Sequence, residues 1–142
     1  ALIEPRIARM AARAMTPDSL KTLQGHVDAE HEVTAQGDMG MALAHSGAFH
    51  LAIADIADQA VLTQILHTLV SRSSLIIALY WRRRDTGCES HSHHALLKAF
   101  SNKDENSAED IMKSHMVDLH SGLDLSDRSE SQRTLADVFA KI

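Results

Sequence analysis

Apolar residues recur along this chain at steps of three and four positions, which is the period of an amphipathic helix. Because no run of β-branched and aromatic residues alternates with the period of two that a strand requires, the pattern predicts an all-α fold. The expected helices lie near residues 2–14, 17–36, 38–57, 59–84, 93–100 and 105–121, with a further short helix near 135–139. Six to seven helices with short connections favour an antiparallel bundle.

The ends of these helices carry recognisable signals. The segment Thr16-Pro17-Asp18 combines an N-cap hydroxyl, a proline suited to the first helical position and an acid in the first turn. Gly37, Gly87 and Gly122 each follow a helical stretch and are expected to end or break it. In the fourth stretch, the apolar residues expected to face the interior are Leu62, Ile65, Leu66, Leu69, Ile76 and Leu79.

Length and composition narrow the class of protein. A chain of 142 residues with 44% hydrophobic residues fits one globular domain. The net charge of −5 argues against this segment being a nucleic-acid-binding surface by itself. No continuous apolar run predicts a membrane span, and the single cysteine, Cys88, excludes an internal disulfide and favours a reducing cytoplasm. Because the chain starts without Met and its first residues read as the inside of a helix, we expect a segment upstream.

Three of the ten histidines lie on the apolar stripes of three separate helical stretches. They are His50, His93 and His115. A neutral imidazole that faces a core must satisfy two ring nitrogens. Each histidine therefore either has its own hydrogen-bond partners, or all three converge on one divalent metal ion. The other histidines have more polar surroundings and are expected to be solvated; they are His26, His31, His45, His67, His91, His94 and His120.

Four segments resemble a known family, the FadR C-terminal (FCD) effector-binding domain of GntR-type transcription regulators. They are LIEPRIARMAARAMTPDSLKTL, FHLAIADIADQAVL (with Gln59 where Asn is usual), HHALLKAF and AEDIMKSHM. The third segment selects His93 over its neighbours His91 and His94, and the fourth selects His115. The resemblance covers roughly residues 2–120 and keeps the order of the elements.

This resemblance implies an all-helical domain, residues 1–142, that binds a small effector, often a carboxylate, in its interior and forms a homodimer. It also implies that DNA is contacted only through a winged helix-turn-helix domain, which would lie upstream of Ala1. In metal-binding members of the family, one aspartate and three histidines hold a divalent ion. His50, His93 and His115 take the three histidine positions, so the resemblance predicts a metal ion, with Zn or Ni favoured.

The position of the family's aspartate is occupied by Ser46, four residues before His50. A neutral hydroxyl is a poor metal ligand, and one negative charge is lost. The resemblance therefore leaves three outcomes open: a three-histidine site with an open position that Ser46 borders, a weak site, or none.

The function expected is the sensing of a small organic acid near the metal, without catalysis. Arg72 is the expected effector contact, because a charge in the middle of an apolar helix needs an explanation; the alternative is an arginine whose stem lies on the helix surface. A metal-dependent hydrolase or hydratase is a second hypothesis, although Asp55 is on a different face from His50 and no other carboxylate is placed as a base. A third is a helical dimerisation module that binds no ligand.

Overall fold

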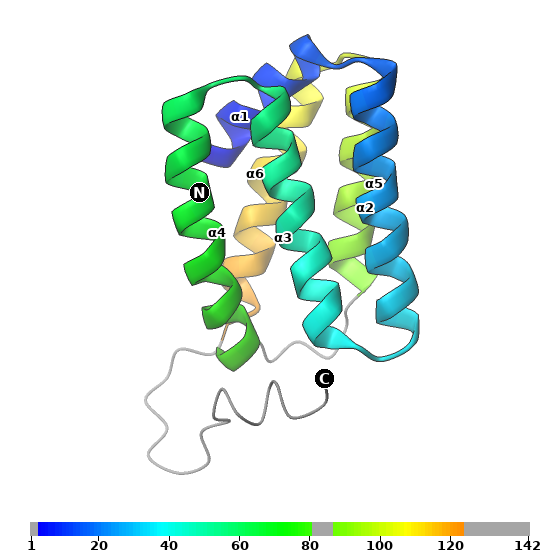
Figure 1. Cartoon of the computed structure of the whole chain (residues 1–142), viewed down its shortest axis with the longest axis vertical. Helices are drawn as coiled ribbons and strands as arrows, with labels where there is room; N and C mark the ends of the chain where they lie inside the picture. Colours follow the sequence, from blue (N-terminus) through cyan, green and yellow to red (C-terminus); the bar gives the residue numbers. More distant parts are fainter. Residues whose placement is uncertain (1–2, 81–86, 124–142) are drawn as a thin grey trace.

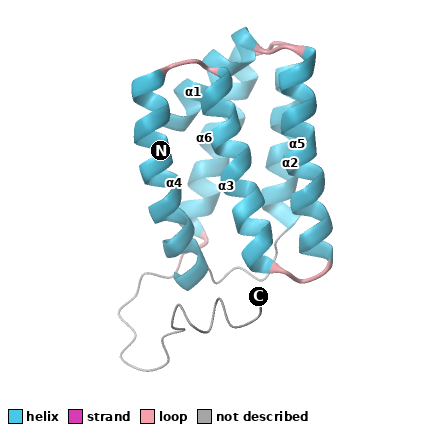
Figure 2. Ribbon diagram, in the orientation of Figure 1, coloured by secondary structure: helices cyan, strands magenta, loops and turns pink. Residues whose placement is uncertain are grey.

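The computed structural model describes residues 3–80 and 87–123, with side chains described from residue 91 onward in the second range. Over these residues the chain forms a bundle of α-helices, as Figures 1 and 2 show. The helices are α1 (Ile3–Ala14), α2 (Pro17–Ala35), α3 (Met39–Ile56), α4 (Ala60–Tyr80), α5 (Gly87–Ser101) and α6 (Glu105–Ser121). The all-α prediction is confirmed, whereas the short helix expected near 135–139 lies outside the described residues.

The helix ends follow from local hydrogen bonds. Thr16 and Ser19 form a capping box at the start of α2, in which each side chain accepts from the other residue's backbone N–H. Asp38 and Asp104 cap α3 and α6 by accepting a hydrogen bond of 3.0 Å from the backbone N–H three residues later. Gly37 adopts a φ of +78° after α2, a conformation in which glycine has no steric cost. These ends confirm the turn signals at Thr16 and Gly37.

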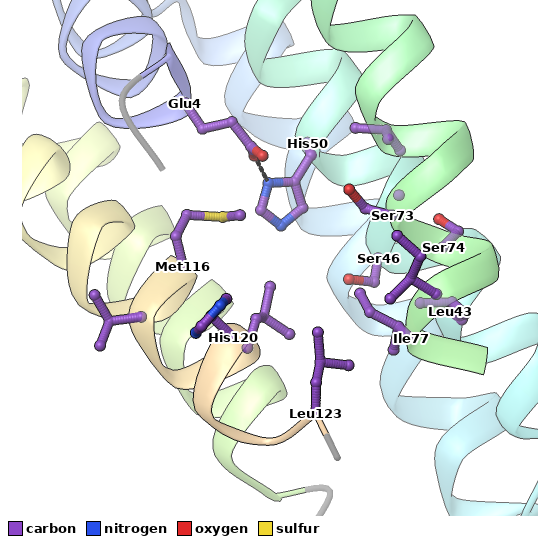
Figure 3. A pocket seen from close by; sticks show the side chains of 15 residues that line it. Glu4, Leu43, Ser46, His50, Ser73, Ser74, Ile77, Met116, His120 and Leu123 are labelled. Carbon is purple, nitrogen blue, oxygen red and sulfur yellow. Dashed lines mark hydrogen bonds and ion pairs between the residues drawn. The ribbon is translucent and has the colours of Figure 1, made fainter. Parts of the chain in front are cut away.

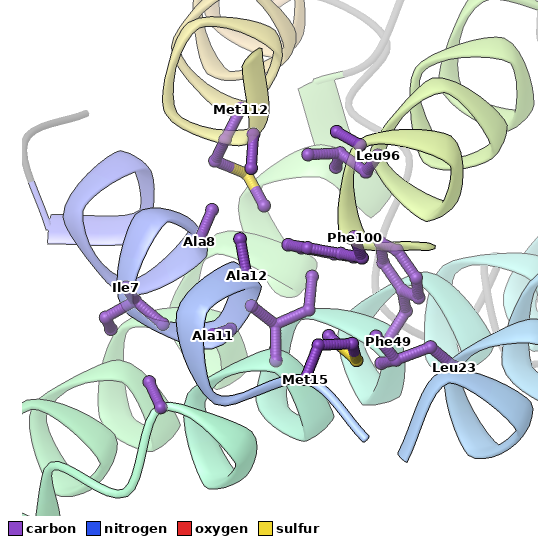
Figure 4. Close-up of a cluster of buried hydrophobic side chains, with 14 of the residues drawn as sticks. Ile7, Ala8, Ala11, Ala12, Met15, Leu23, Phe49, Leu96, Phe100 and Met112 are labelled. Atoms are coloured by element: carbon purple, nitrogen blue, oxygen red, sulfur yellow. The ribbon is translucent and has the colours of Figure 1, made fainter. Parts of the chain in front are cut away.

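The bundle places α3 between α2 and α4, with α1, α5 and α6 behind this front layer (Figure 1). The core lies where α1, α2, α3, α5 and α6 meet, as Figure 4 shows. Its largest fully buried side chains are Phe49, Phe100, Ile7, Leu23, Ile53, Leu66, Leu96 and Met112. Ala8, Ala11 and Ala12 of α1 are also buried, and their small size lets α1 approach its neighbours closely. This packing fixes α3, α5 and α6, the helices that carry the three histidines.

Two expectations about the helices are wrong. Of the α4 residues expected to face the interior, Ile65, Leu69 and Ile76 are 42–43% exposed, and only Leu66 is buried. The reason is that α4 lies at the edge of the bundle and packs mainly against α3, so its apolar surface is wider than the surface that covers it. In addition, α5 begins at Gly87, earlier than the expected start near His93.

The helix α4 also bears on the expectation that no segment is suited to a membrane. By length and composition alone, Ala60–Tyr80 is apolar enough to cross one. No continuous apolar run marks this helix in the sequence, because the polar residues of α4 are scattered along its length. One helix of this kind is weak evidence for a membrane protein, and a wide apolar face on an edge helix is equally typical of a surface that binds another protein.

Candidate metal centre

The three histidines singled out by the sequence meet inside the bundle. His50 comes from α3, His93 from α5 and His115 from α6, and one nitrogen of each lies within 4.8 Å of the others. The Nε2 atoms of His50 and His115 are 3.2 Å apart. All three side chains are buried, with His93 fully so. Imidazole nitrogens that converge in this way can serve as three ligands of a single divalent ion.

Two carboxylates, one half-buried and one buried, contact the outer nitrogens of this cluster. Glu4 of α1 forms an ion-pair contact with Nδ1 of His50, and Glu30 of α2 lies 2.7 Å from Nδ1 of His93. An ionised carboxylate accepts the Nδ1–H hydrogen, which leaves the Nε2 lone pair free to face the cluster. The pairing of a carboxylate with a metal-binding histidine is common, because it fixes both the tautomer and the orientation of the ring.

The inner nitrogens show that the residues present fit a metal ion. Nε2 of His93 is buried and has no hydrogen-bond partner among the described residues. Leaving such an atom unsatisfied costs about 1–3 kcal/mol. A divalent ion among the three Nε2 atoms would satisfy the orphaned nitrogen and the close His50–His115 pair together. Separate hydrogen bonds for each histidine, the alternative left open by the sequence, do not account for His93.

The surroundings of His93 and His115 favour their neutral forms. Burial, followed by the charge of His50, lowers the pKa of His115 to about 2 and that of His93 well below its usual value. Burial also raises the pKa of Glu30 to about 7, against the opposing effect of nearby histidines. For Glu4, burial acts to raise the pKa, but its contact with His50 and the charge of His115 together lower it below the usual value. Neutral imidazoles at neutral pH are the form that binds a metal.

A cavity of about 490 Å³ opens beside His50, between α3, α4 and α6 (Figure 3). Ser46 is buried one turn before His50 and lines this cavity, so the residue at the position that the resemblance assigns to an aspartate borders the histidine cluster. Ser73 and Ser74 of α4 line it as well. Each residue that the sequence associated with ligand binding, apart from Arg72, thus lies at the histidine cluster or in the adjacent cavity wall.

Arg72 lies on a different part of α4. It is exposed, and among the described residues the cavity wall does not include it, although it includes the next residue, Ser73. By helical spacing, Arg72 falls on the outward face that also carries Val61, Ile65 and Leu69, all of them exposed. Its role as an effector contact stays a prediction.

Three residues of the site were missed by the sequence reasoning. Glu30 follows Leu23 and Val27 at steps of four and three, so the helical period already placed a carboxylate on the buried face of α2. Glu4 precedes Ile7 by the same kind of step. His120, expected to be solvated, is exposed but lines the cavity, one turn after Met116. In each case the helical spacing from a neighbouring apolar residue could be read from the sequence. The sequence did not show which residue of another helix would lie opposite.

An all-helical domain with a ligand-sized cavity next to a polar cluster is typical of the sensor part of a regulator. Similarity to known proteins supports the same class. The family model for the FCD domain matches residues 1–118. The chain therefore belongs to the FCD family of GntR/FadR-type regulators, which is a regulatory and not an enzymatic family. This membership removes the hydrolase or hydratase hypothesis.

A solved structure shares this fold. The chain is similar to E. coli McbR/YncC, with a TM-score of 0.68 and 20% sequence identity over 84% of this chain. It spans 63% of the length of that protein. No curated protein matches the chain. At this level of identity the structural likeness shows the fold alone, so the ligand and the partners have to be argued from the site itself.

Proposed function

We propose that this chain is the ligand-sensing domain of a bacterial GntR/FadR-type transcription regulator, which holds a divalent metal ion through His50, His93 and His115 and binds a small organic acid beside it. The observation that carries the proposal is the group of three buried imidazole nitrogens within 4.8 Å of one another, next to a cavity that His50 also lines. Three neutral ligands leave the positive charge of the ion largely intact, so an anion in the cavity is attracted to it.

The metal is expected to be Zn or Ni, because imidazole nitrogen suits both ions. Protein purified without a chelator and without nickel resin should contain close to one equivalent, or should take up one equivalent of added Zn. Elemental analysis measures the content, and His91→Ala, an exposed histidine on the same helix as His93, serves as the control. A protein that neither contains nor takes up either ion would contradict the metal site, and the ligand-free dimerisation module would then be the better account.

Binding of an acid should stabilise the fold in proportion to the logarithm of its concentration over its dissociation constant. We expect a thermal shift with at least one organic acid, and we expect His93→Ala to abolish the shift because the metal is lost with its ligand. Arg72→Ala should weaken binding less, since an exposed guanidinium next to the cavity wall acts mainly through long-range attraction that salt screens. A thermal shift that persists in His93→Ala would show that the acid binds elsewhere. An unchanged affinity for the acid in Arg72→Ala would show that Arg72 does not contribute to the site.

The domain is also proposed to form a homodimer through α4, in the cytoplasm, and to act on DNA only through an additional N-terminal domain. The outward face of α4 carries Val61, Ile65 and Leu69, which are 71%, 42% and 43% exposed, and a contiguous apolar surface of this kind marks an interaction site. Leu69→Lys should convert a dimer into a monomer in analytical ultracentrifugation, whereas Val117→Lys on α6, also an exposed apolar residue, should not. A wild-type chain that is monomeric at micromolar concentration would overturn this part.

A further inference from the structure

The walls of the cavity differ sharply in polarity from one end to the other. Figure 3 shows Glu4 and His50 at one end, with Ser46 and Ser73 between them and Ser74, which lies farther along beside Leu43. Leu43, Ile77 and Leu123 lie toward the opposite end. The exposed ring of His120 lies on the facing wall between these regions. A ligand that fills this space therefore meets polar groups mainly at the end where it would reach the metal.

The charges around the cavity limit the ligand further. Among the lining residues that the structure describes, Glu4 is the only carboxylate, and none is an arginine or a lysine. A divalent ion at the histidines would carry +2, which Glu4 and Glu30 offset when both are ionised, so one carboxylate can still bind the ion directly but no excess positive charge is left for a second. A second anionic group would lie against Leu43 and Ile77 with no cation there and only the Ser74 hydroxyl close by as a donor, and burying a charge with so little compensation is strongly unfavourable.

We propose that the cavity selects monocarboxylates with an apolar body, the carboxylate at the His50 end and the body against Leu43, Ile77 and Leu123. This inference rests on the proposed function and names the class of acid. It places dicarboxylates, sugar acids and phosphorylated ligands outside the class. The hydroxyls of Ser46, Ser73 and Ser74 are placed to donate hydrogen bonds to the carboxylate or to a polar substituent close to it.

The size of the cavity makes the inference quantitative. A volume of about 490 Å³ lies within the usual range for small-molecule sites, roughly 300–1,000 Å³. Each methylene that moves from water into the apolar end should strengthen binding about fourfold, the equivalent of about 0.8 kcal/mol. Affinity should therefore rise along a series of straight-chain acids until the cavity is full.

The test is calorimetric titration of the zinc-loaded protein with butanoate, hexanoate, octanoate and octanedioate. Each step of two methylenes should tighten binding about 16-fold at first, and octanedioate should bind at least about tenfold more weakly than octanoate because its second carboxylate is left unpaired. An affinity that does not depend on chain length, or octanedioate or gluconate binding as tightly as octanoate, would overturn the inference.

A matched pair of substitutions on α4 locates the apolar body. Ile77→Thr adds a hydroxyl to the cavity wall and should weaken octanoate binding several-fold while leaving butanoate unaffected. Leu75→Thr makes a similar change on the same helix at a residue that is 45% exposed and does not line the cavity among the described residues, so it should alter neither. Octanoate binding that is equal in both variants would show that the acid binds at another surface.

The outcomes also separate this inference from the function on which it rests. Zinc-dependent binding of octanedioate or gluconate, without binding of the apolar acids, would keep the sensor function and reject the ligand class. Failure of the protein to bind zinc, or of the zinc-loaded protein to bind any acid, would reject both.

Discussion

Replacing Ser46 by Asp should tighten zinc binding by at least about tenfold, because a direct carboxylate ligand is expected to contribute no less than the outer hydrogen-bond partners of metal sites. Ser46 is buried, lies one helical turn before His50 and borders the histidine cluster through the cavity wall. An aspartate there adds an anionic oxygen to three neutral ligands. In the metal-free protein the same carboxylate is buried without a partner, so Ser46→Asp should lower the melting temperature until zinc is added.

The experiment is competition for zinc against a chromogenic chelator. Ser74→Asp provides the control, because it places the same charge in the same cavity but on α4, away from the turn that carries His50. If both variants tighten zinc binding equally, the effect is one of overall charge and not of coordination. If Ser46→Asp leaves the affinity unchanged, another group already occupies the fourth position.

Glu30→Gln should weaken zinc binding about 10–100-fold, the range found for outer partners of metal-binding histidines. The amide oxygen can still accept the Nδ1–H hydrogen of His93, so the substitution removes mainly the negative charge. Because burial raises the pKa of Glu30 to about 7, keeping that carboxylate ionised in the interior is unfavourable in the metal-free protein. Glu30→Gln should therefore leave metal-free stability unchanged or raise it while the metal affinity falls.

This opposite movement of stability and affinity distinguishes a positioning residue from a merely structural one. Glu32→Gln, on the same helix but exposed, is the matched control and should change neither quantity. Nitrogen NMR of the histidine side chains gives a second readout, since the Nδ1–H tautomer of His93 should be less strongly populated in Glu30→Gln. A parallel loss of stability and metal affinity would show that Glu30 serves the fold and not the site.

The sequence predicted the parts of this structure that depend on local chemistry. Thr16 and Gly37 mark helix ends because capping hydrogen bonds and positive φ angles act over only a few residues. The inward direction of His50, His93 and His115 followed from helical spacing within single helices. The resemblance to the FCD family added the order of the elements, and with it the expectation that the three histidines meet.

The rest depends on how helices distant in sequence are placed against one another. Helical period identified an apolar face of α4 but not that α3 covers only part of it, so Ile65 and Leu69 were wrongly expected to be buried. Glu4 contacts an imidazole that lies 46 positions later in the chain, and Glu30 contacts one that lies 63 positions later. The cavity exists because side chains of α4 and α6 leave space beside His50. Its presence depends on how these helices are placed, so it cannot be predicted from any single segment.

The edge helix α4 has two surfaces with different uses: Ser73, Ser74 and Ile77 face the cavity, while Val61, Ile65 and Leu69 face outward. If a partner subunit packs on the outward surface, occupancy of the cavity and association of subunits are thermodynamically linked through one rigid element. If binding of the acid changes the association constant of the subunits by some factor, then association must change the affinity for the acid by the same factor. The apparent acid affinity of this domain would then vary with protein concentration, which is how a signal received inside the bundle would reach its surface.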